Sequence, residues 1–150
     1  MDETAEHHSR QRPYRSVTRT IGRIVLGAFL LMAGISHLTV SRVAFRAQVP
    51  QWVPVDTDLV VVASGIVEIA LGLSLLLLAR RQVIVGLVVA GFFVLVFPGN
   101  ISQLITHTAS FGLDTDLARG IRLLFQPLLV VWALWATGAW AAIRNRRPLA

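Results

Sequence analysis

Apolar residues fall into four long stretches along the chain, separated by short polar segments. The stretches cover about residues 21–40, 59–79, 83–104 and 121–143, and each is close to the ~20 residues that cross a ~30 Å hydrocarbon core as a helix. The third stretch is interrupted late by Pro98, Asn100 and Gln103, but a proline near the end of a membrane helix is tolerated when neighbouring groups satisfy the freed carbonyl. The pattern predicts an all-α integral membrane protein, folded as a four-helix bundle.

Composition supports this prediction. The chain of 150 residues is 55% hydrophobic and 15% charged, against roughly 45–50% and about 25% in ordinary soluble domains. A soluble domain of this length would need more polar side chains to cover its surface. The chain also contains no cysteine, which excludes disulfides, thiolate metal sites and thiol chemistry by its own residues.

All 14 basic residues are arginines, and 12 of them lie outside the four apolar stretches, while Arg23 and Arg122 lie within three residues of the start of a stretch. Ten of the 14 fall on one side of the predicted bundle, in residues 10–23, 80–81 and 144–147. The positive-inside rule makes this side cytoplasmic and places both termini there. We therefore expect a disordered cytoplasmic arm (1–20), a transmembrane domain (21–143) and a basic cytoplasmic tail (144–150). Arginines spread over membrane flanks do not form a basic face for nucleic acid.

The connection over residues 41–58 is predicted to be an outer loop that contains prolines. Pro50 and Pro54 exclude a long helix, and Phe45 and Trp52 favour a position at the membrane interface. The loop ends in Val-Asp-Thr-Asp-Leu at residues 55–59, and Leu-Asp-Thr-Asp-Leu recurs at 113–117. Because an aspartate caps unpaired helix N–H groups, each copy predicts a helix start. A duplication of two helical hairpins is the alternative explanation of the repeat.

A few polar residues lie inside the apolar stretches, where they are costly. Glu68 follows Leu59 by nine residues, or ~14 Å of helix, and a carboxylate near mid-membrane costs about 2.5–3.5 kcal/mol. Such groups mark functional sites by default. We expect several of them at neighbouring depths in the outer half of the bundle, forming a ligand pocket from His37, Ser64, Glu68, Asn100, Arg122 and Gln126. Glu68 and His37 are the candidate catalytic residues.

Each of these residues also has a structural interpretation. Glu68 could pair with His37 or Arg122 to hold helices together, and Arg122 could extend to the outer surface. Asn100 could cap an interrupted helix, and Gln126 could bridge two helices. The joint occurrence of a carboxylate, an imidazole, two amides and a guanidinium favours a ligand site over a purely structural role in helix packing.

Other small and polar residues have structural interpretations. Two glycine pairs spaced by seven residues, Gly27 with Gly34 and Gly65 with Gly72, predict close contact between helices. The adjacent histidines at positions 7 and 8 lie in the polar arm and are expected to be solvated. No metal site is predicted. A haem held by two histidines is disfavoured, because His107 falls at or beyond the membrane surface.

Several of these residues recur in a specific order and spacing. They are Gly34-Ile35-Ser36-His37, Phe45, Pro50-x-Trp52-x-Pro54, Ser64-Gly65 with Glu68, Phe97-Pro98-x-Asn100-Ile101, and Arg122 with Gln126-Pro127 and Trp132. This pattern resembles the DoxX family of small four-span bacterial membrane proteins and covers about residues 22–138. The resemblance implies a multi-pass protein of the bacterial cytoplasmic membrane. The family is named after a subunit of a thiosulfate:quinone oxidoreductase, and other members are associated with membrane oxidoreductases and oxidative stress.

The resemblance leads us to expect a subunit or partner of a quinone-linked oxidoreductase or redox-stress complex, acting without thiols. Quinone is the one cofactor that it suggests, and whether the chain is itself an enzyme stays open. The alternatives are a small proton-coupled transporter, a lipid- or metabolite-binding protein, and a structural scaffold. The expected partners are the lipid bilayer, other membrane subunits and a second copy of the chain.

Overall fold

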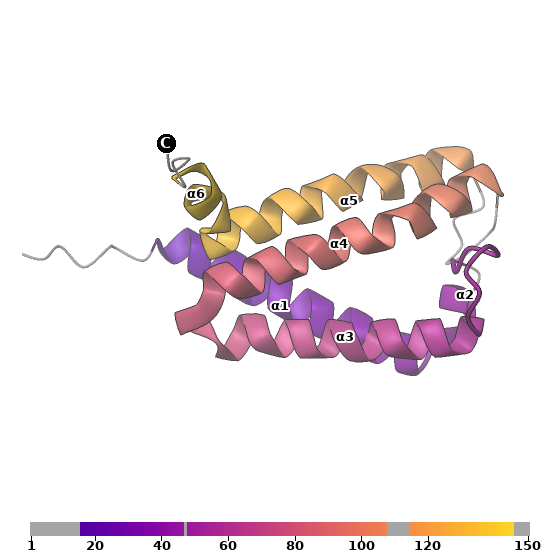
Figure 1. Ribbon diagram of the computed structural model, residues 1–150, viewed down its shortest axis with the longest axis horizontal. Coiled ribbons are helices and arrows are strands. Elements are labelled where there is room, and N and C mark those ends of the chain that lie inside the picture. Colours follow the sequence, from indigo (N-terminus) through magenta and orange to yellow (C-terminus); the bar gives the residue numbers. More distant parts are fainter. Residues whose placement is uncertain (1–15, 47, 108–114, 146–150) are drawn as a thin grey trace, which may run out of the picture.

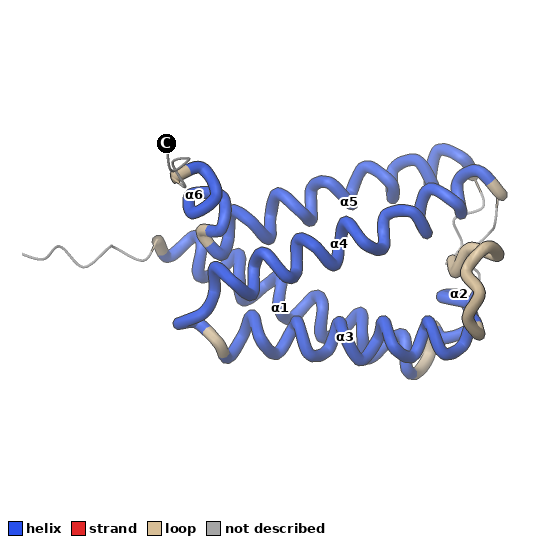
Figure 2. The backbone as a smooth tube through the Cα atoms, in the orientation of Figure 1, coloured by secondary structure: helices blue, strands red, loops and turns tan. Residues whose placement is uncertain are grey.

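The computed structural model describes residues 16–46, 48–107 and 115–145. The regular elements in these residues are all helical (Figure 2). Four long helices are α1 (Val17–Leu38), α3 (Thr57–Leu77), α4 (Gln82–Ile105) and α5 (Asp116–Thr137). Three short elements are α2 (Arg42–Arg46), the 3-10 helix η1 (Ala79–Arg81) and α6 (Ala139–Arg144). Four helical spans, the third of them η1 and α4 together, are long and apolar enough to cross a membrane. The prediction of four membrane-length helices is confirmed.

The four long helices form two antiparallel pairs. Helix α1 packs along α3, and α4 packs along α5 (Figure 1). The pairs meet at the end of the bundle where α6 lies, and they diverge toward the end where α2 lies (Figure 1). At the first end, which we call the α6 end, Trp132 of α5 donates a hydrogen bond to the Gly22 carbonyl of α1 at 3.1 Å. The opposite end is called the α2 end.

Glycines bring α1 and α3 into backbone contact. A Cβ atom on Gly34 would lie 2.6 Å from the Gly65 carbonyl oxygen, and one on Gly72 would lie 2.7 Å from the Gly27 carbonyl oxygen. Any side chain at these positions would therefore separate the helices. The predicted close contact between the two glycine pairs is confirmed.

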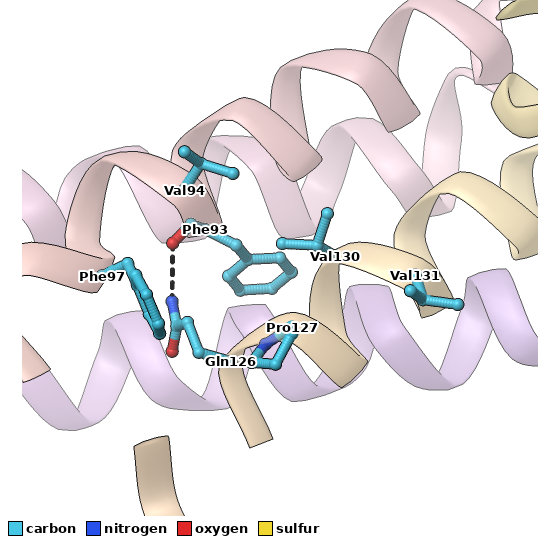
Figure 3. Close-up of a pocket in the computed structure, with 7 residues that line it drawn as sticks. All are labelled: Phe93, Val94, Phe97, Gln126, Pro127, Val130 and Val131. Atoms are coloured by element: carbon cyan, nitrogen blue, oxygen red, sulfur yellow. Dashed lines mark hydrogen bonds between the residues drawn. The ribbon is translucent and has the colours of Figure 1, made fainter. Parts of the chain in front are cut away.

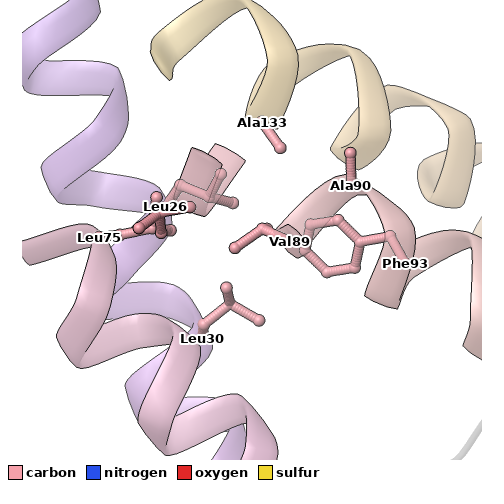
Figure 4. Packing of buried hydrophobic residues seen from close by; sticks show 8 residues of the cluster. Leu26, Leu30, Leu75, Val89, Ala90, Phe93 and Ala133 are labelled. Carbon is pink, nitrogen blue, oxygen red and sulfur yellow. The ribbon is translucent and has the colours of Figure 1, made fainter. Parts of the chain in front are cut away.

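The hydrophobic core lies toward the α6 end. Leu26 and Leu30 of α1, Leu75 of α3 and Val89 of α4 are at most 1% exposed, and Figure 4 shows them facing one another. Phe93 and Ala133 complete the contact between the two helix pairs. This packing joins the four helices in one half of the bundle.

Polar caps define the starts of α3 and α5. Asp56 accepts a hydrogen bond from the Leu59 backbone N–H at 2.9 Å, and Thr115 accepts one from the Ala118 N–H at 3.2 Å. The aspartate of the first repeat is therefore a helix cap, as predicted, whereas a threonine caps the second helix. Asp114 lies outside the described residues.

Helix α1 begins earlier than predicted, so residues 17–20 of the predicted arm are helical. The extra turn brings Arg23 well inside the helix, where it is 6% exposed and donates to the Leu75 carbonyl. Leu75 lies in the last turn of α3, whose carbonyls lack helical partners. The arginine therefore stabilises the end of α3. The rest of the arm, residues 1–15, and the tail residues 146–150 lie outside the described residues.

The structure differs from the prediction in the course of the third span and in the end of the fourth. Helix α4 passes through Pro98 and continues to Ile105, so there is no break before Asn100. The fourth span was predicted to run to residue 143, which is wrong, because α5 ends at Thr137. Gly138 follows with φ 76°, a left-handed conformation that terminates helices, and α6 is a separate short helix.

Candidate functional site

A histidine, a serine and a glutamate meet between α1 and α3. His37 lies in the last turn of α1, and Ser64 and Glu68 lie one turn apart on α3. His37 Nδ1 is 3.2 Å from Glu68 Oε2 and 3.4 Å from Ser64 Oγ. The side chains of His37 and Glu68 are only 7% and 13% exposed. Three of the six predicted site residues therefore form one group, which we call the His37 group.

The contacts of Ser64 and Glu68 favour a hydrogen on Nδ1 of His37. When Ser64 Oγ donates its single hydrogen to the Val61 carbonyl at 2.9 Å, it accepts from His37 Nδ1. A hydrogen on Nδ1 also lies next to the Glu68 carboxylate. When His37 is neutral, its free lone pair is therefore on Nε2.

The Glu68 carboxylate is incompletely satisfied. Its Oε2 atom is buried, and within the described part of the chain it has no partner that meets hydrogen-bond geometry. His37 Nδ1 lies within ion-pair distance of this atom, but the contact does not have hydrogen-bond geometry. A buried acceptor in this state costs free energy.

A loop and a short helix cover the His37 group at the α2 end. The Phe45 ring of α2 lies edge-to-face against the His37 ring, with an angle of 86° between the planes. Helix α2 is fixed by Arg42 and Arg46, whose Nε atoms both donate to Asp58 Oδ1 at 2.8 Å. The Asp58 carboxylate raises the pKa of Arg42. This ion pair holds α2 on the first turn of α3.

A second polar group joins α4 to α5. Gln126 is 7% exposed, and both ends of its amide are bonded. Nε2 donates to the Phe93 carbonyl at 2.7 Å, and Oε1 accepts from Asn100 Nδ2 at 2.9 Å. Gln126 therefore bridges the two helices. Asn100 lies inside a continuous helix, so the interpretation of Asn100 as a cap is wrong.

Arg122 lies between the two polar groups. It follows Arg119 by one turn and precedes Gln126 by one turn on α5. Its Nη2 donates to Gln48 Oε1 at 2.5 Å, which ties the outer loop to α5. Its positive charge also acts through space on the His37 imidazole. Arg122 is thus the link between the α4–α5 pair and the His37 group.

The predicted site residues form two bonded groups on different helix pairs, with Arg122 between them. Sequence reasoning did not assign site roles to two residues of the cover, Phe45 and Gln48. Phe45 could have been predicted, because it is an aromatic residue that follows His37 by only eight positions in the sequence. Gln48 could not, since a glutamine in a polar loop is ordinary.

An apolar groove lies on the α4–α5 surface (Figure 3). Its volume is about 270 Å³, and it is lined by Phe93, Val94, Phe97, Gln126, Pro127, Val130 and Val131. The Gln126 amide in its wall already bonds Phe93 and Asn100. The lining therefore presents almost only hydrocarbon to whatever fills the groove.

The fold and these groups define a four-span α-helical membrane protein with paired polar residues in its spans. The chain belongs to the family described as Domain of unknown function (DUF8561), whose model matches residues 26–137. The match runs from the middle of α1 to the last residue of α5 and includes all six predicted site residues. No curated protein and no solved structure matches the chain.

Proposed function

We propose that this protein is a DoxX-like membrane protein that binds a quinol-type headgroup at the His37 group, as a subunit or partner of a membrane oxidoreductase. The observation that carries the proposal is the orientation of His37. Nδ1 lies between Ser64 and Glu68, so a hydrogen on Nδ1 leaves Nε2 as an acceptor inside the membrane-spanning region. The resemblance suggests the quinone, and this acceptor supports a contact with a quinol hydroxyl.

The residues of the site fit such a headgroup. A ligand hydroxyl can donate to His37 Nε2, and the buried Glu68 Oε2 lacks a hydrogen-bonded partner among the described residues. When bound, a quinol would supply two electrons and two protons. The electrons would pass to the redox centre of a partner subunit, and His37 would accept the two protons one after the other, releasing the first before it accepts the second.

His37 has the role of proton acceptor in this proposal. A proton taken up at Nε2 makes the ring an imidazolium, and the carboxylate at 3.2 Å from Nδ1 stabilises that charge. Phe45 excludes water from one edge of the imidazole.

Asn100 and Gln126 have a positioning role. Their amides bond each other and the Phe93 carbonyl, so they hold α4 against α5 at the level of the site. The sequence predicted Asn100 and Gln126 as ligand contacts. In this proposal they are not, and the ligand contacts are His37, Ser64, Glu68 and Arg122.

Extraction of bound molecules tests the proposal. The protein is purified from bacterial membranes in mild detergent, and quinones are quantified by mass spectrometry after solvent extraction. We expect the unmodified chain to retain quinone, and His37→Ala and Glu68→Gln to lose it. His107→Asn is the matched control, because His107 is exposed and its φ of 51° suits asparagine. Absence of quinone from the unmodified chain, or full retention by His37→Ala, overturns the proposal.

We further propose that the protein lies in the bacterial cytoplasmic membrane with both termini in the cytoplasm. The support is the arginine distribution and the placement of the start of α1 and of α6 at one end of the bundle (Figure 1). Since the chain has no cysteine, single cysteines report sidedness. In intact cells an impermeant maleimide should label Val43→Cys at the α2 end and should reach Asn145→Cys only after permeabilisation. The reverse pattern overturns this orientation.

A second candidate function is binding of a lipid chain. The groove between α4 and α5 supports it, because the groove lies in two membrane-spanning helices and its single amide is engaged elsewhere. An apolar chain is the occupant that such a lining accommodates without desolvation cost.

A further inference from the structure

Buried side chains differ in character between the two halves of the bundle. On α4 the buried apolar residues end at Phe93, and on α5 they begin at Ala133. Closer to the α2 end, the buried side chains that the structure describes on these two helices are Gln103, Arg119 and Gln126. The interior of this helix pair is therefore polar toward α2 and apolar toward α6.

The α1–α3 pair follows this division only in part. Leu26, Leu30 and Leu75 are fully buried on the α6 side of His37 and Glu68, but the buried Arg23 lies beyond them, and the buried Val61 lies on the α2 side. Between His37 and the α2 end come the α2 cover and the Arg42 and Arg46 contacts to Asp58. Charged residues therefore lie between the His37 group and the surface at the α2 end.

We propose that the His37–Glu68 pair exchanges protons with water on the α2 side of the membrane only, through this polar half of the interior. The inference rests on the proposed function, because it gives the route of the proton that His37 accepts. Ionisable residues inside a membrane bundle face water or one another, and buried water requires several polar partners. The buried Gln103, Arg119 and Gln126 supply such partners on the α2 side of the pair.

The opposite side is closed by packing. Leu26, Leu30, Leu75 and Val89 fill the space between the helix pairs with contacts at 0–1% exposure (Figure 4). Glycine contacts at Gly27 and Gly72 leave no room between α1 and α3 at this level. Water has no polar side-chain partner within this layer of leucines and valine, so the layer separates the His37–Glu68 pair from the buried Arg23 and Thr137 on the α6 side.

The charged groups around the route have defined positions. On α5 they are Arg122, whose charge acts on His37, and Arg119, which donates to the His107 carbonyl at 3.0 Å. Arg42, Arg46 and Asp58 form one cluster where α2 meets α3. From α4 the described side chains at this level are the neutral amides Asn100 and Gln103. The described charged side chains along the route therefore carry more positive than negative charge, which disfavours the entry of metal cations.

Two serines on one helix allow a matched test. Ser64 lies in the His37 group, and Ser74 lies ten residues further along α3, or ~15 Å, next to the core residue Leu75. Both are half-buried. Ser64→Cys and Ser74→Cys are each reconstituted in sealed vesicles, and a small charged thiol reagent is applied to either face. Val43→Cys and Asn145→Cys identify the faces.

We expect the thiol introduced by Ser64→Cys to react with reagent on the α2 side and not with reagent on the α6 side. The thiol introduced by Ser74→Cys should not react from the α2 side. Reaction of the Ser64→Cys thiol from both sides, from the α6 side alone, or from neither side overturns the proposal.

Infrared spectroscopy supplies a second measurement on the unmodified chain, so that misfolding of a cysteine variant is not decisive. The carboxyl band that Glu68→Gln removes should change when pH is stepped on the α2 side of sealed vesicles, and should stay constant when pH is stepped on the other side. A response to either side overturns the route. If the unmodified chain retains no quinone but shows one-sided proton access, the proposed function is overturned and the proton route is not.

Discussion

Glu68 Oε2 on α3 lies 3.2 Å from His37 Nδ1 on α1. The two groups are paired in a membrane-spanning region, and each is the nearest charge-bearing partner that the other has in the described structure. Their pairing couples the stability of the α1–α3 contact to the chemistry of the site.

Replacing both members of this pair should cost less than the two single replacements added together. His37→Leu leaves the buried Glu68 carboxyl without its neighbour, which we expect to lower the free energy of unfolding by about 1–3 kcal/mol. The double variant His37→Leu, Glu68→Leu should cost less than the sum of the two single changes. Reversible unfolding in denaturing detergent gives the three values. Strict additivity would show that the two residues do not interact.

The glycine contact between α1 and α3 should be intolerant of even one methyl group. A Cβ on Gly34 meets three atoms within 2.9 Å, among them the Gly65 carbonyl oxygen and the Ile69 backbone nitrogen. Backbone atoms cannot rotate away, so Gly34→Ala should destabilise the protein by about 1–3 kcal/mol.

The control for this change is Gly91→Ala, because Gly91 has nothing within 4 Å of the added Cβ. Helix propensity then favours alanine by about 1 kcal/mol. Opposite signs for the two substitutions in the same unfolding assay are expected. Equal effects would mean that the helices separate without cost.

The fold was largely predictable because bilayer thickness sets the length of an apolar stretch. The ends of the helices were less predictable, because tertiary contacts decide where each helix begins and ends. The added first turn of α1 accompanies the contact of Arg23 with the Leu75 carbonyl, which depends on where α3 ends. The termination at Gly138 depends on a left-handed conformation that a glycine permits but does not require.

The candidate site was predictable in composition but not in pairing. A carboxylate in an apolar stretch is costly wherever it faces, so Glu68 was evident from the sequence. Depth along a helix also follows from residue number, which placed His37 and Asn100 in the same half. Which residues touch depends on helix packing, and α1 pairs with α3 while α4 pairs with α5 (Figure 1). The six residues therefore separate into two bonded groups.

The cover over the His37 group should loosen when its ion pair is removed. Asp58→Asn takes the negative charge from the contacts of Arg42 and Arg46 and leaves two guanidinium groups side by side. We expect faster hydrogen exchange and faster proteolysis in residues 41–56, with the four long helices unchanged. Asp56→Asn is the control, since asparagine also caps a helix. Identical exchange in both variants would show that the ion pair does not hold α2.

Filling the groove between α4 and α5 should release a bound chain without unfolding the protein. Val131 lines the groove and is 52% exposed, and Val88 of α4 is 53% exposed but lies outside it. Val131→Trp places an indole ring in a volume of about 270 Å³, whereas Val88→Trp adds the same ring to an open surface. Native mass spectrometry of protein in mild detergent should show lipid adducts for the unmodified chain and for Val88→Trp, and fewer for Val131→Trp. Retention of the same lipids by Val131→Trp would rule out the groove as their site. Equal thermal stability of the two variants would show that Val131→Trp loses lipid because the indole ring fills the groove and not because the protein unfolds.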